Sequence, residues 1–421
     1  EKYLKELGHS PVKNRISCSS KSASGNTFAT LFNEPSTRTR LSLESAALRL
    51  GGSTISSSDP ATSSAAKGES LADTVRVISN YADVLVIRHP RDGAAKLAAE
   101  FAEIPVINGG DGSHEHPTQT LCDLFTLKQE KEKKSFKNLN VLISGDLRGS
   151  RTIHSFVYAL ARFGANTTLM PGGHGMELPD HVFWRLRNEF NQRIDQRDSS
   201  SSVDMIYVTA EPADRQTPIS KVEMIRYLES NDEVDILYMT RFQKERWADI
   251  QRSDYLKVDE EFLKKSKFRN ASVLHPLPRV GELATELDET PRAAYFRQAA
   301  YGVPVRMALI AALLDLEPGP ALQKFDGGFK VSLYNTHEQP RDLGTLCPND
   351  NCITHDEHDS KDTRNRFYIV RDHRLRCYYC ETDIEDLLVG SKKDHIGFFH
   401  NREMMDKAGY RPNKNLHIAA E

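Results

Sequence analysis

The sequence contains no long apolar run and no large excess of charge of either sign. No stretch approaches the roughly 20 apolar residues of a membrane-spanning helix, and no signal peptide is expected at its start. The chain has 56 Lys and Arg residues against 59 Asp and Glu residues, a formal charge of −3 at pH 7. This near balance argues against a nucleic-acid or anionic-membrane binder. Any anion chemistry must therefore come from local groups of arginine.

Cysteine is also scarce, and its distribution is uneven. The 421-residue chain has six cysteines; four lie together near the C-terminus, whereas Cys18 and Cys122 stand alone. In a chain of this length the pattern predicts one metal site and two free thiols in a reducing cytoplasm, not a disulfide framework. The length also predicts two or three domains rather than one core.

Short apolar segments alternate with amphipathic segments over the first three quarters of the sequence, which is typical of a parallel α/β fold. A hydrophilic stretch at 128–137 divides the expected strands into two sets. These strands are 27–32, 84–87 and 106–108 in the first set, and 139–144, 167–170, 234–239 and 272–275 in the second. The sequence therefore predicts two doubly wound parallel-sheet domains followed by a small, β-rich metal-binding module. The predicted parts are a first domain at 1–130, a second at 131–300, an interdomain helix at 301–319, a linker at 320–346 and the module at 347–421.

Residues 36–40 read Ser-Thr-Arg-Thr-Arg and lie between an expected strand and an expected helix at 41–50. A helix N-terminus presents free N–H groups and a positive dipole end, and small hydroxyl side chains leave room there for an anion. Two arginines add bidentate donors for phosphate. The segment favours a phosphate site; the alternative is an ordinary serine cap with solvated arginines.

Histidine and arginine motifs also lie at the ends of other expected strands. Arg88 and His116 lie at such positions in the first half, and Arg151, Arg241 and the segment 275–279 do so in the second. Ligands bind at the carboxyl ends of strands in open parallel sheets, and several arginines around one crevice suit a substrate with two carboxylates. A lone histidine or arginine is more often structural, so the argument depends on the motifs taken together.

Taken in order, these motifs resemble those of the carbamoyltransferase family over about residues 27–316. The matching segments are 35–40 (Pro-Ser-Thr-Arg-Thr-Arg), 67–74 (Lys-Gly-Glu-Ser-Leu-Ala-Asp-Thr), 88–90 (Arg-His-Pro) and 116–119 (His-Pro-Thr-Gln) for the carbamoyl-phosphate half, and 145–147 (Gly-Asp-Leu), 151–155 (Arg-Thr-Ile-His-Ser), 241–246 (Arg-Phe-Gln-Lys-Glu-Arg) and 275–279 (His-Pro-Leu-Pro-Arg) for the amino-acid half. The resemblance implies transfer of a carbamoyl group from carbamoyl phosphate to an amino acid, with no cofactor in the chemistry.

The resemblance also implies roles for single residues. Carbamoyl phosphate is expected to bind Ser36, Thr37, Arg38, Thr39, Arg88, His116 and Gln119, with the backbone of Leu277 and Pro278. L-Aspartate is expected to bind Lys67, Arg151, Arg241 and Gln243. The implied catalytic set is Arg38, Thr39, Lys67, Arg88 and His116, of which Thr39, Arg88 and His116 would polarise the carbonyl oxygen. In this family the loop carrying the equivalent of Lys67 reaches a neighbouring subunit's site, so a homotrimer with shared active sites is expected.

Several residues favour aspartate over ornithine as the acceptor. Ornithine enzymes of the family carry a cysteine at the position of Pro276 and lack the loop lysine that Lys67 supplies. Arg151 and Arg241 suit a dicarboxylate and would repel the terminal cation of ornithine. Ala66 departs from the pattern, since bacterial aspartate enzymes often have a second lysine there. The resemblance therefore implies N-carbamoyl-L-aspartate as the product, in pyrimidine biosynthesis.

The four clustered cysteines form two pairs, Cys347 with Cys352 and Cys377 with Cys380. Tetrahedral zinc takes four thiolates at about 2.3 Å, and closely spaced cysteines supply them in pairs. We expect a structural zinc site rather than four unrelated thiols. The surrounding segments are similar to the zinc domain of the regulatory chain of the aspartate enzymes, without the nucleotide-binding domain that precedes it there. The resemblance implies docking on the catalytic part, and two trimers joined through these modules are one arrangement that it allows.

Three other interpretations remain open from the sequence alone. The acceptor could be another amino acid, because acceptor choice depends on few residues. The chain could be a catalytically silent relative kept for assembly or regulation, although every expected catalytic residue is present. A zinc-ribbon nucleic-acid binder is disfavoured by the lack of a basic surplus.

Overall fold

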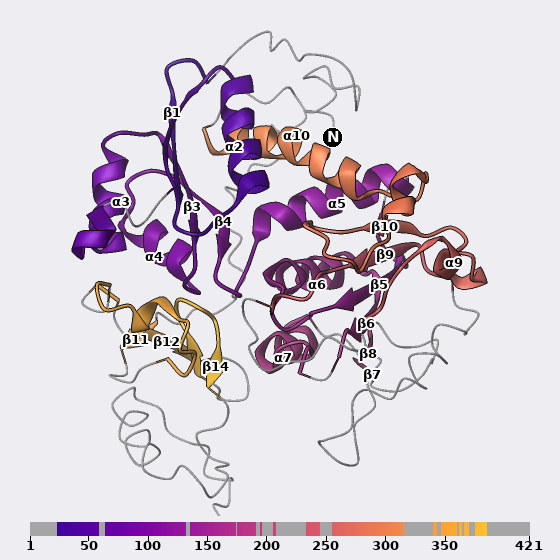
Figure 1. Ribbon diagram of the computed structural model, residues 1–421. Helices are drawn as coiled ribbons and strands as arrows, with labels where there is room; N and C mark the ends of the chain where they lie inside the picture. The colour runs from indigo at the N-terminus through magenta and orange to yellow at the C-terminus, as the bar shows by residue number, and fades with distance from the viewer. Residues whose placement is uncertain are drawn as a thin grey trace, which may run out of the picture.

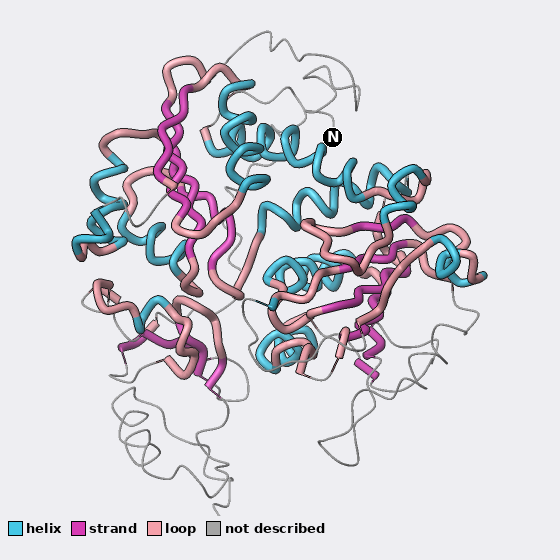
Figure 2. Tube along the Cα trace, in the orientation of Figure 1, coloured by secondary structure: helices cyan, strands magenta, loops and turns pink. Residues whose placement is uncertain are grey.

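The computed structural model contains two α/β domains and a smaller C-terminal module, each with its own sheet (Figure 1 and Figure 2). The described residues are 23–58, 64–131, 135–173, 175–190, 194–195, 205–207, 233–244, 255–314, 316, 340–342, 347–359, 362–363, 366–369 and 375–384. None of the helices in these ranges is both long and apolar enough to cross a membrane. The architecture confirms the predicted fold class.

The first domain is built on a parallel sheet with the strand order β2-β1-β3-β4. Its elements are β1 (Thr27–Phe32), α2 (Thr37–Arg49), β2 (Ser53–Ser57), η2 (Ser64–Lys67), α3 (Leu71–Ser79), β3 (Val84–His89), α4 (Ala94–Phe101) and β4 (Val106–Asp111). Successive side chains of a strand point to opposite faces of its sheet. Phe28 packs with α2, whereas Ala29 packs with α3 and α4. Helices therefore cover both faces, as a doubly wound fold requires.

The second domain has a parallel sheet with the strand order β10-β9-β5-β6-β8-β7. Its elements are β5 (Asn140–Gly145), α6 (Arg151–Phe163), β6 (Asn166–Pro171), α7 (Asp180–Asn188), β7 (Ile194–Asp195), β8 (Met205–Tyr207), β9 (Ile236–Met239), α9 (Glu260–Leu263), η4 (Ser266–Phe268), β10 (Ser272–Leu274) and η5 (Thr285–Glu289). The apolar face of α6, which includes Phe156 and Leu160, is fully buried in the core cluster of this domain. Gly164 ends α6 at φ +71°, a left-handed conformation that glycine adopts without strain.

Two helices, α5 (Pro117–Lys131) and α10 (Tyr295–Leu313), pack against each other between the domains (Figure 1). Asp123 of α5 is fully buried, and its carboxylate accepts hydrogen bonds from Nε2 of Gln298 at 2.6 Å and from the hydroxyl of Tyr238 at 2.9 Å. The helix expected at 301–319 begins earlier in the structure, at Tyr295, and Pro304 lies inside α10. These contacts fasten α5 both to α10 and to β9.

The C-terminal module has an antiparallel sheet made of β11 (Arg341–Asp342), β12 (Arg366–Ile369), β13 (Leu375–Cys377) and β14 (Asp383–Ile384), with the short helix η6 (Ile353–His355) before β12. Among its described residues, the buried apolar side chains do not form a separate cluster. Ile353, Phe367 and Tyr379 pack in the same cluster as Leu71 and Leu97 of the first domain. The module is therefore packed against the first domain of its own chain.

Candidate active site and metal centre

Helix α2 begins shortly after β1, at the predicted anion-binding segment. Ser36 occupies the N-cap position in an extended conformation, and its side chain makes no capping hydrogen bond. The first turn of α2 contains no acidic residue. This helix end therefore presents its N–H groups and positive dipole next to the hydroxyls of Ser36 and Thr37.

Thr39 and His116, predicted to act on one carbonyl oxygen, lie beside each other. Oγ1 of Thr39 is 3.4 Å from Nε2 of His116, and both side chains are buried. The backbone N–H of His116 donates to Oγ of Ser155 on α6 at 2.9 Å, so the second domain holds this residue of the first. Burial, together with the charges of Arg88 and Arg151, keeps the pKa of His116 well below its usual value. The imidazole is therefore neutral near pH 7, with one donor and one acceptor nitrogen.

Glu34 connects arginines from the two domains. Its Oε1 accepts hydrogen bonds from Nη2 of Arg88 at 2.9 Å and from Nη2 of Arg151 at 2.7 Å, and its Oε2 accepts from Nη1 of Arg151 at 3.0 Å. Nη1 of Arg151 also donates to the backbone oxygen of Gly112 at 2.8 Å. Glu34 was not predicted from the sequence, although an acidic residue directly before the cationic segment is a usable signal. The structure thus brings Arg88 and Arg151 to one carboxylate.

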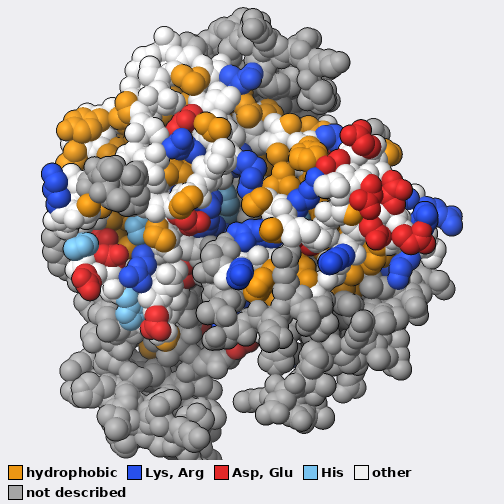
Figure 3. All heavy atoms as spheres, in the orientation of Figure 1, with side chains coloured by type: hydrophobic (Ala, Val, Ile, Leu, Met, Phe, Trp, Pro, Cys, Tyr) orange, Lys and Arg blue, Asp and Glu red, His pale blue; other side chains and the backbone are white. Residues whose placement is uncertain are grey.

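Arg38 and Arg241 belong to different domains, and the charge of Arg241 acts on Arg38. Partial burial and the nearby charge of Arg241 lower the pKa of Arg38. Nη1 of Arg241 donates to the backbone oxygen of Phe242 at 3.1 Å, and the backbone N–H of Gln243 donates to Oδ2 of Asp146 at 3.2 Å. Two positive charges that act on each other across the domain boundary favour an anionic ligand near both. Figure 3 shows positive side chains gathered where the two α/β domains meet.

Two predicted residues are directed elsewhere. The side chain of Gln119 donates to Oδ1 of Asp123 at 2.7 Å, so contact with a ligand through this amide would require a rotation. Lys67 is exposed on η2, and within the described part of the chain no hydrogen bond or ion pair joins it to the other predicted site residues. The neighbouring Gly68 lies beside His358 of the C-terminal module, 3.4 Å from where its Cβ would be.

The turn after β10 is held by its own polar contacts. The backbone N–H of His275 donates to Oε1 of Gln298 at 2.9 Å, and its Nδ1 accepts from the N–H of Leu277 at 2.8 Å. This assigns the ring proton to Nε2, which lies 2.8 Å from Oε1 of Glu282. Leu277 adopts φ +52°, an uncommon conformation for a residue with a side chain. The backbone of Leu277 and Pro278, predicted to contact the carbamoyl group, therefore has a fixed local conformation.

The four predicted metal ligands meet in the C-terminal module. The sulfurs of Cys347 and Cys380 are 3.4 Å apart, those of Cys352 and Cys377 are 3.8 Å apart, and all four lie within 4.8 Å of one another. All four side chains are buried. Sulfurs placed about 2.3 Å from one tetrahedral centre would be about 3.8 Å apart. The four thiols therefore fit a single metal ion.

Comparison with protein-family models gives three matches along the chain. Residues 4–129 match the carbamoyl-P binding domain of the aspartate/ornithine carbamoyltransferases, and residues 211–313 match their Asp/Orn binding domain. Residues 345–387 match the metal binding domain of the aspartate carbamoyltransferase regulatory chain. The order of these matches follows the two α/β domains and the C-terminal module.

Curated relatives share much of the sequence. The chain is 46% identical over 299 residues to the aspartate carbamoyltransferase catalytic subunit of Clostridium kluyveri, a match covering 70% of this chain and 87% of that protein. It is also 46% identical over 291 residues to the catalytic subunit of Thermoplasma acidophilum, which covers 68% of this chain and 85% of the relative. Both relatives are thus matched over most of their length.

Solved structures give the same result. The catalytic subunit of M. jannaschii aspartate transcarbamoylase matches with a TM-score of 0.57 and 39% identity, covering 71% of this chain and 89% of that one. Aspartate transcarbamoylase from Trypanosoma cruzi, in complex with carbamoyl aspartate and phosphate, matches with a TM-score of 0.57 and 35% identity, covering 69% and 84%. The chain therefore belongs to the aspartate carbamoyltransferase family, and its C-terminal module is related to the metal-binding domain of that family's regulatory chains.

Proposed function

We propose that the meeting point of the two α/β domains is the active site in which this enzyme transfers the carbamoyl group of carbamoyl phosphate to L-aspartate. The products are N-carbamoyl-L-aspartate and phosphate, and the reaction serves pyrimidine biosynthesis. The observation that carries the proposal is the convergence of Arg88 and Arg151 on Glu34, beside the contact between Thr39 and His116. In this proposal residues 1–130 bind carbamoyl phosphate and residues 131–300 bind aspartate.

Carbamoyl phosphate occupies the N-terminus of α2. The N–H groups of that helix end, the hydroxyls of Ser36 and Thr37 and the guanidinium of Arg38 hold its phosphate. Its carbonyl oxygen points toward Thr39, Arg88 and His116. The amide of the carbamoyl group meets the backbone of Leu277 and Pro278, and Gln119 joins this set after the rotation described above.

The reaction replaces one bond to the carbamoyl carbon with another. The neutral amine of aspartate attacks that carbon, and negative charge grows on the carbonyl oxygen. Arg88, Thr39 and His116 donate hydrogen bonds to this oxygen, with His116 acting as a neutral donor because its pKa is depressed. The carbon–oxygen bond to phosphate then breaks, and the proton released by the amine leaves with phosphate. Catalysis consists of positioning and electrostatic stabilisation.

Aspartate is held by its two carboxylates. Arg151 and Arg241 supply bidentate donors, and Gln243 adds a hydrogen-bonding amide. Glu34 bonds to Arg151 and to Arg88 at once, so a single carboxylate orients arginines that serve both substrates. This arrangement suits a dicarboxylate and disfavours the terminal cation of ornithine.

The remaining catalytic residue, Lys67, acts in a neighbouring subunit. Its exposed position on η2 supports this assignment, because the side chain is directed to solvent in the single chain. Closed rings are the usual result when one surface of a subunit completes the site of the next. The enzyme is thus a homotrimer with shared active sites, and the C-terminal modules join two such trimers.

The metal is zinc with a structural role. Four thiolates fill a tetrahedral shell and leave no position for water or substrate, so the ion supplies folding energy and takes no part in the transfer. The separate clustering of the catalytic residues supports this view. We place the enzyme in the cytoplasm, where thiols remain reduced and able to bind metal.

A direct assay tests the proposal. Purified full chain is incubated with carbamoyl phosphate and L-aspartate, and carbamoyl aspartate and phosphate are measured, with ornithine as the control acceptor. We expect equal amounts of the two products with aspartate and none above background with ornithine. Transfer to ornithine or to another amino acid in preference to aspartate would overturn the acceptor assignment. Absence of transfer by folded, metal-loaded protein would favour the catalytically silent alternative.

A further inference from the structure

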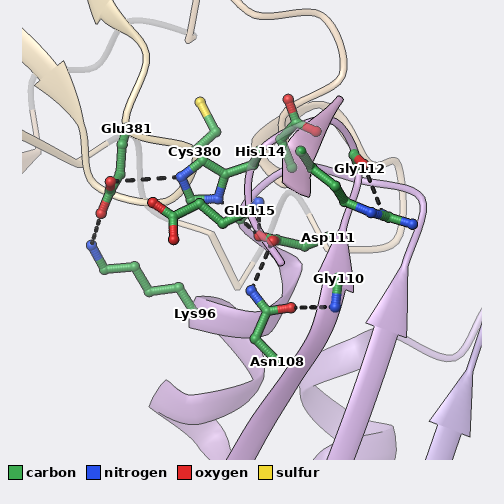
Figure 4. Close-up of polar contacts among 12 residues, drawn as sticks. Lys96, Asn108, Gly110, Asp111, Gly112, His114, Glu115, Cys380 and Glu381 are labelled. Atoms are coloured by element: carbon green, nitrogen blue, oxygen red, sulfur yellow. Dashed lines mark hydrogen bonds and ion pairs between the residues drawn. The ribbon is translucent and has the colours of Figure 1, made fainter. Parts of the chain in front are cut away.

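A largely buried group of charged residues joins the C-terminal module to both α/β domains. Figure 4 shows its residues from the first domain and from the module. This junction cluster consists of Asp111, His114, Glu115, Arg185 and Glu381, with Lys96 at its edge. Oε2 of Glu381 lies 2.8 Å from Nη1 of Arg185 and 3.6 Å from Nε2 of His114, and Oε1 lies 3.9 Å from Nζ of Lys96. Nδ1 of His114 is 3.0 Å from Oδ2 of Asp111. One side chain of the module thus contacts residues from both domains.

The junction cluster is an ion-pair network rather than a second metal site. His114, Glu115 and Glu381 have ligand atoms within 4.8 Å of one another, a spacing that a cation could use. Arg185 and Lys96 already supply positive charge to Glu381, so the carboxylate needs no metal ion.

The cluster holds one end of the loop 111–116, which lies in the active site. The backbone oxygen of Gly112 accepts a hydrogen bond from Arg151 at 2.8 Å. The opposite end of the loop is held by the second domain, through the bond from the His116 N–H to Ser155. The module therefore supports the end of the loop at Gly112, which orients Arg151. The end at His116 is held separately, by Ser155.

A second contact from the module reaches the same end of the loop through Asp92. Oδ1 of Asp92 accepts from the N–H of Ser113 at 2.7 Å and from Nδ2 of Asn351 at 2.9 Å. Nδ2 of Asn349 donates to Oδ2 of the same carboxylate at 2.8 Å. A Cβ at Gly112 would fall 1.7 Å from Oδ1 of Asp92, so the loop packs directly on this carboxylate. Residues next to the metal ligands thus hold the loop at two points.

We propose that Glu381 is a positioning residue for aspartate binding, acting through His114 to hold the loop 111–116 so that Gly112 keeps Arg151 oriented. The proposal rests on the proposed function, in which Arg151 binds aspartate. Loss of the Glu381 charge should then weaken aspartate binding while leaving the chemical step and carbamoyl-phosphate binding nearly unchanged. A residue that merely stabilised the fold would not separate these quantities.

The test compares Glu381→Gln with Glu100→Gln in the full chain. Glu100 lies on α4 and pairs with Arg366 of the module, so its loss weakens docking without touching the loop. With carbamoyl phosphate saturating, we expect Glu381→Gln to raise the KM for aspartate about three- to tenfold, less than the loss of a direct charged hydrogen bond because Glu381 acts through the loop. Its kcat and metal content should stay within about twofold of wild type, and Glu100→Gln should change the KM less than about twofold.

A double-mutant cycle with His114→Gln tests the route. If Glu381 acts through His114, the double variant should have nearly the same KM for aspartate as His114→Gln alone. If Glu381→Gln releases the metal, the KM for aspartate of His114→Gln alone decides the test, because His114 lies in the first domain and not in the module that holds the metal ligands. An unchanged KM in Glu381→Gln, an equal rise in Glu100→Gln, or a loss of kcat with unchanged KM would overturn the proposal. Failure of the proposed function would appear instead as absent transfer by the wild-type chain.

Discussion

The two α/β domains and the C-terminal module are stabilised in different ways. Each α/β domain places apolar residues on both faces of a parallel sheet and covers them with helices of its own. The strands of the module are two to four residues long, and its apolar side chains pack into the cluster of the first domain. The module therefore depends on its metal and on the surface beneath it, because its own core is too small. Catalytic chemistry and metal binding are accordingly separated in the fold.

The strongest test of this separation is the loss of Arg38 or Lys67. We expect Arg38→Ala and Lys67→Ala each to lower kcat by about two to three orders of magnitude, since each removes charge stabilisation at the reacting group. Metal content and thermal unfolding should match the wild type. A large loss of metal in either variant would contradict the separation of chemistry from the module.

Mixing these two variants tests whether the site is shared between subunits. In the proposed trimer an intact site takes Arg38 from one subunit and Lys67 from its neighbour, so random exchange at equal amounts should restore about a quarter of the sites. Activity is measured after subunit exchange has been shown with tagged chains. No recovery after proven exchange would contradict the shared site and the trimer that depends on it.

A smaller effect is expected at the aspartate side of the crevice. Arg241→Ala removes a charged bidentate contact worth about 1.5–3 kcal/mol, which corresponds to an increase of about ten- to a hundredfold in the KM for aspartate. Binding of carbamoyl phosphate, measured by calorimetry in the absence of aspartate, should change far less. Equal weakening of both substrates would contradict the division of roles between the two domains.

The smallest effect on turnover is expected from the module itself. The double change Cys377→Ser and Cys380→Ser removes two thiolates and should abolish metal binding. Light scattering should then show the assembly falling to trimers, while kcat stays within about twofold and the KM for aspartate rises about three- to tenfold as the loop loses its support. Full assembly with lost chemistry would place the metal in the active site instead.

Much of the fold follows from the sequence because buried parallel strands are continuous apolar runs. The strand expected at 27–32 is β1 itself, and each of the other expected strands overlaps one in the structure. β2 was missed because its sequence, Ser-Thr-Ile-Ser-Ser, is polar and its side chains are largely exposed at the sheet edge. The helix expected at 301–319 begins at Tyr295 as α10, and it continues through Pro304.

The positions of the proposed site residues in the fold were partly predictable for a different reason. Strand ends and helix starts mark where ligands bind in open sheets, and Thr39, Arg88, His116 and Arg151 lie there. The partners of Glu34 could not be assigned, because they come from segments far apart in the chain. The junction cluster was equally hidden, since the docking of the module depends on polar side chains that show no periodic pattern.

The paired helices α5 and α10 have a consequence for how the domains can move. These two helices lie side by side across the boundary between the domains and define an axis there. Rotation about this axis is then the main relative motion left to the two domains. The C-terminal module lies on the side of the molecule away from α10 and spans the same boundary (Figure 1). Because the module contacts both domains at a distance from this axis, its contacts resist the remaining rotation. Any swing of one domain against the other must therefore stretch the ion pair between Glu381 and Arg185 and the one between Arg376 and Glu189.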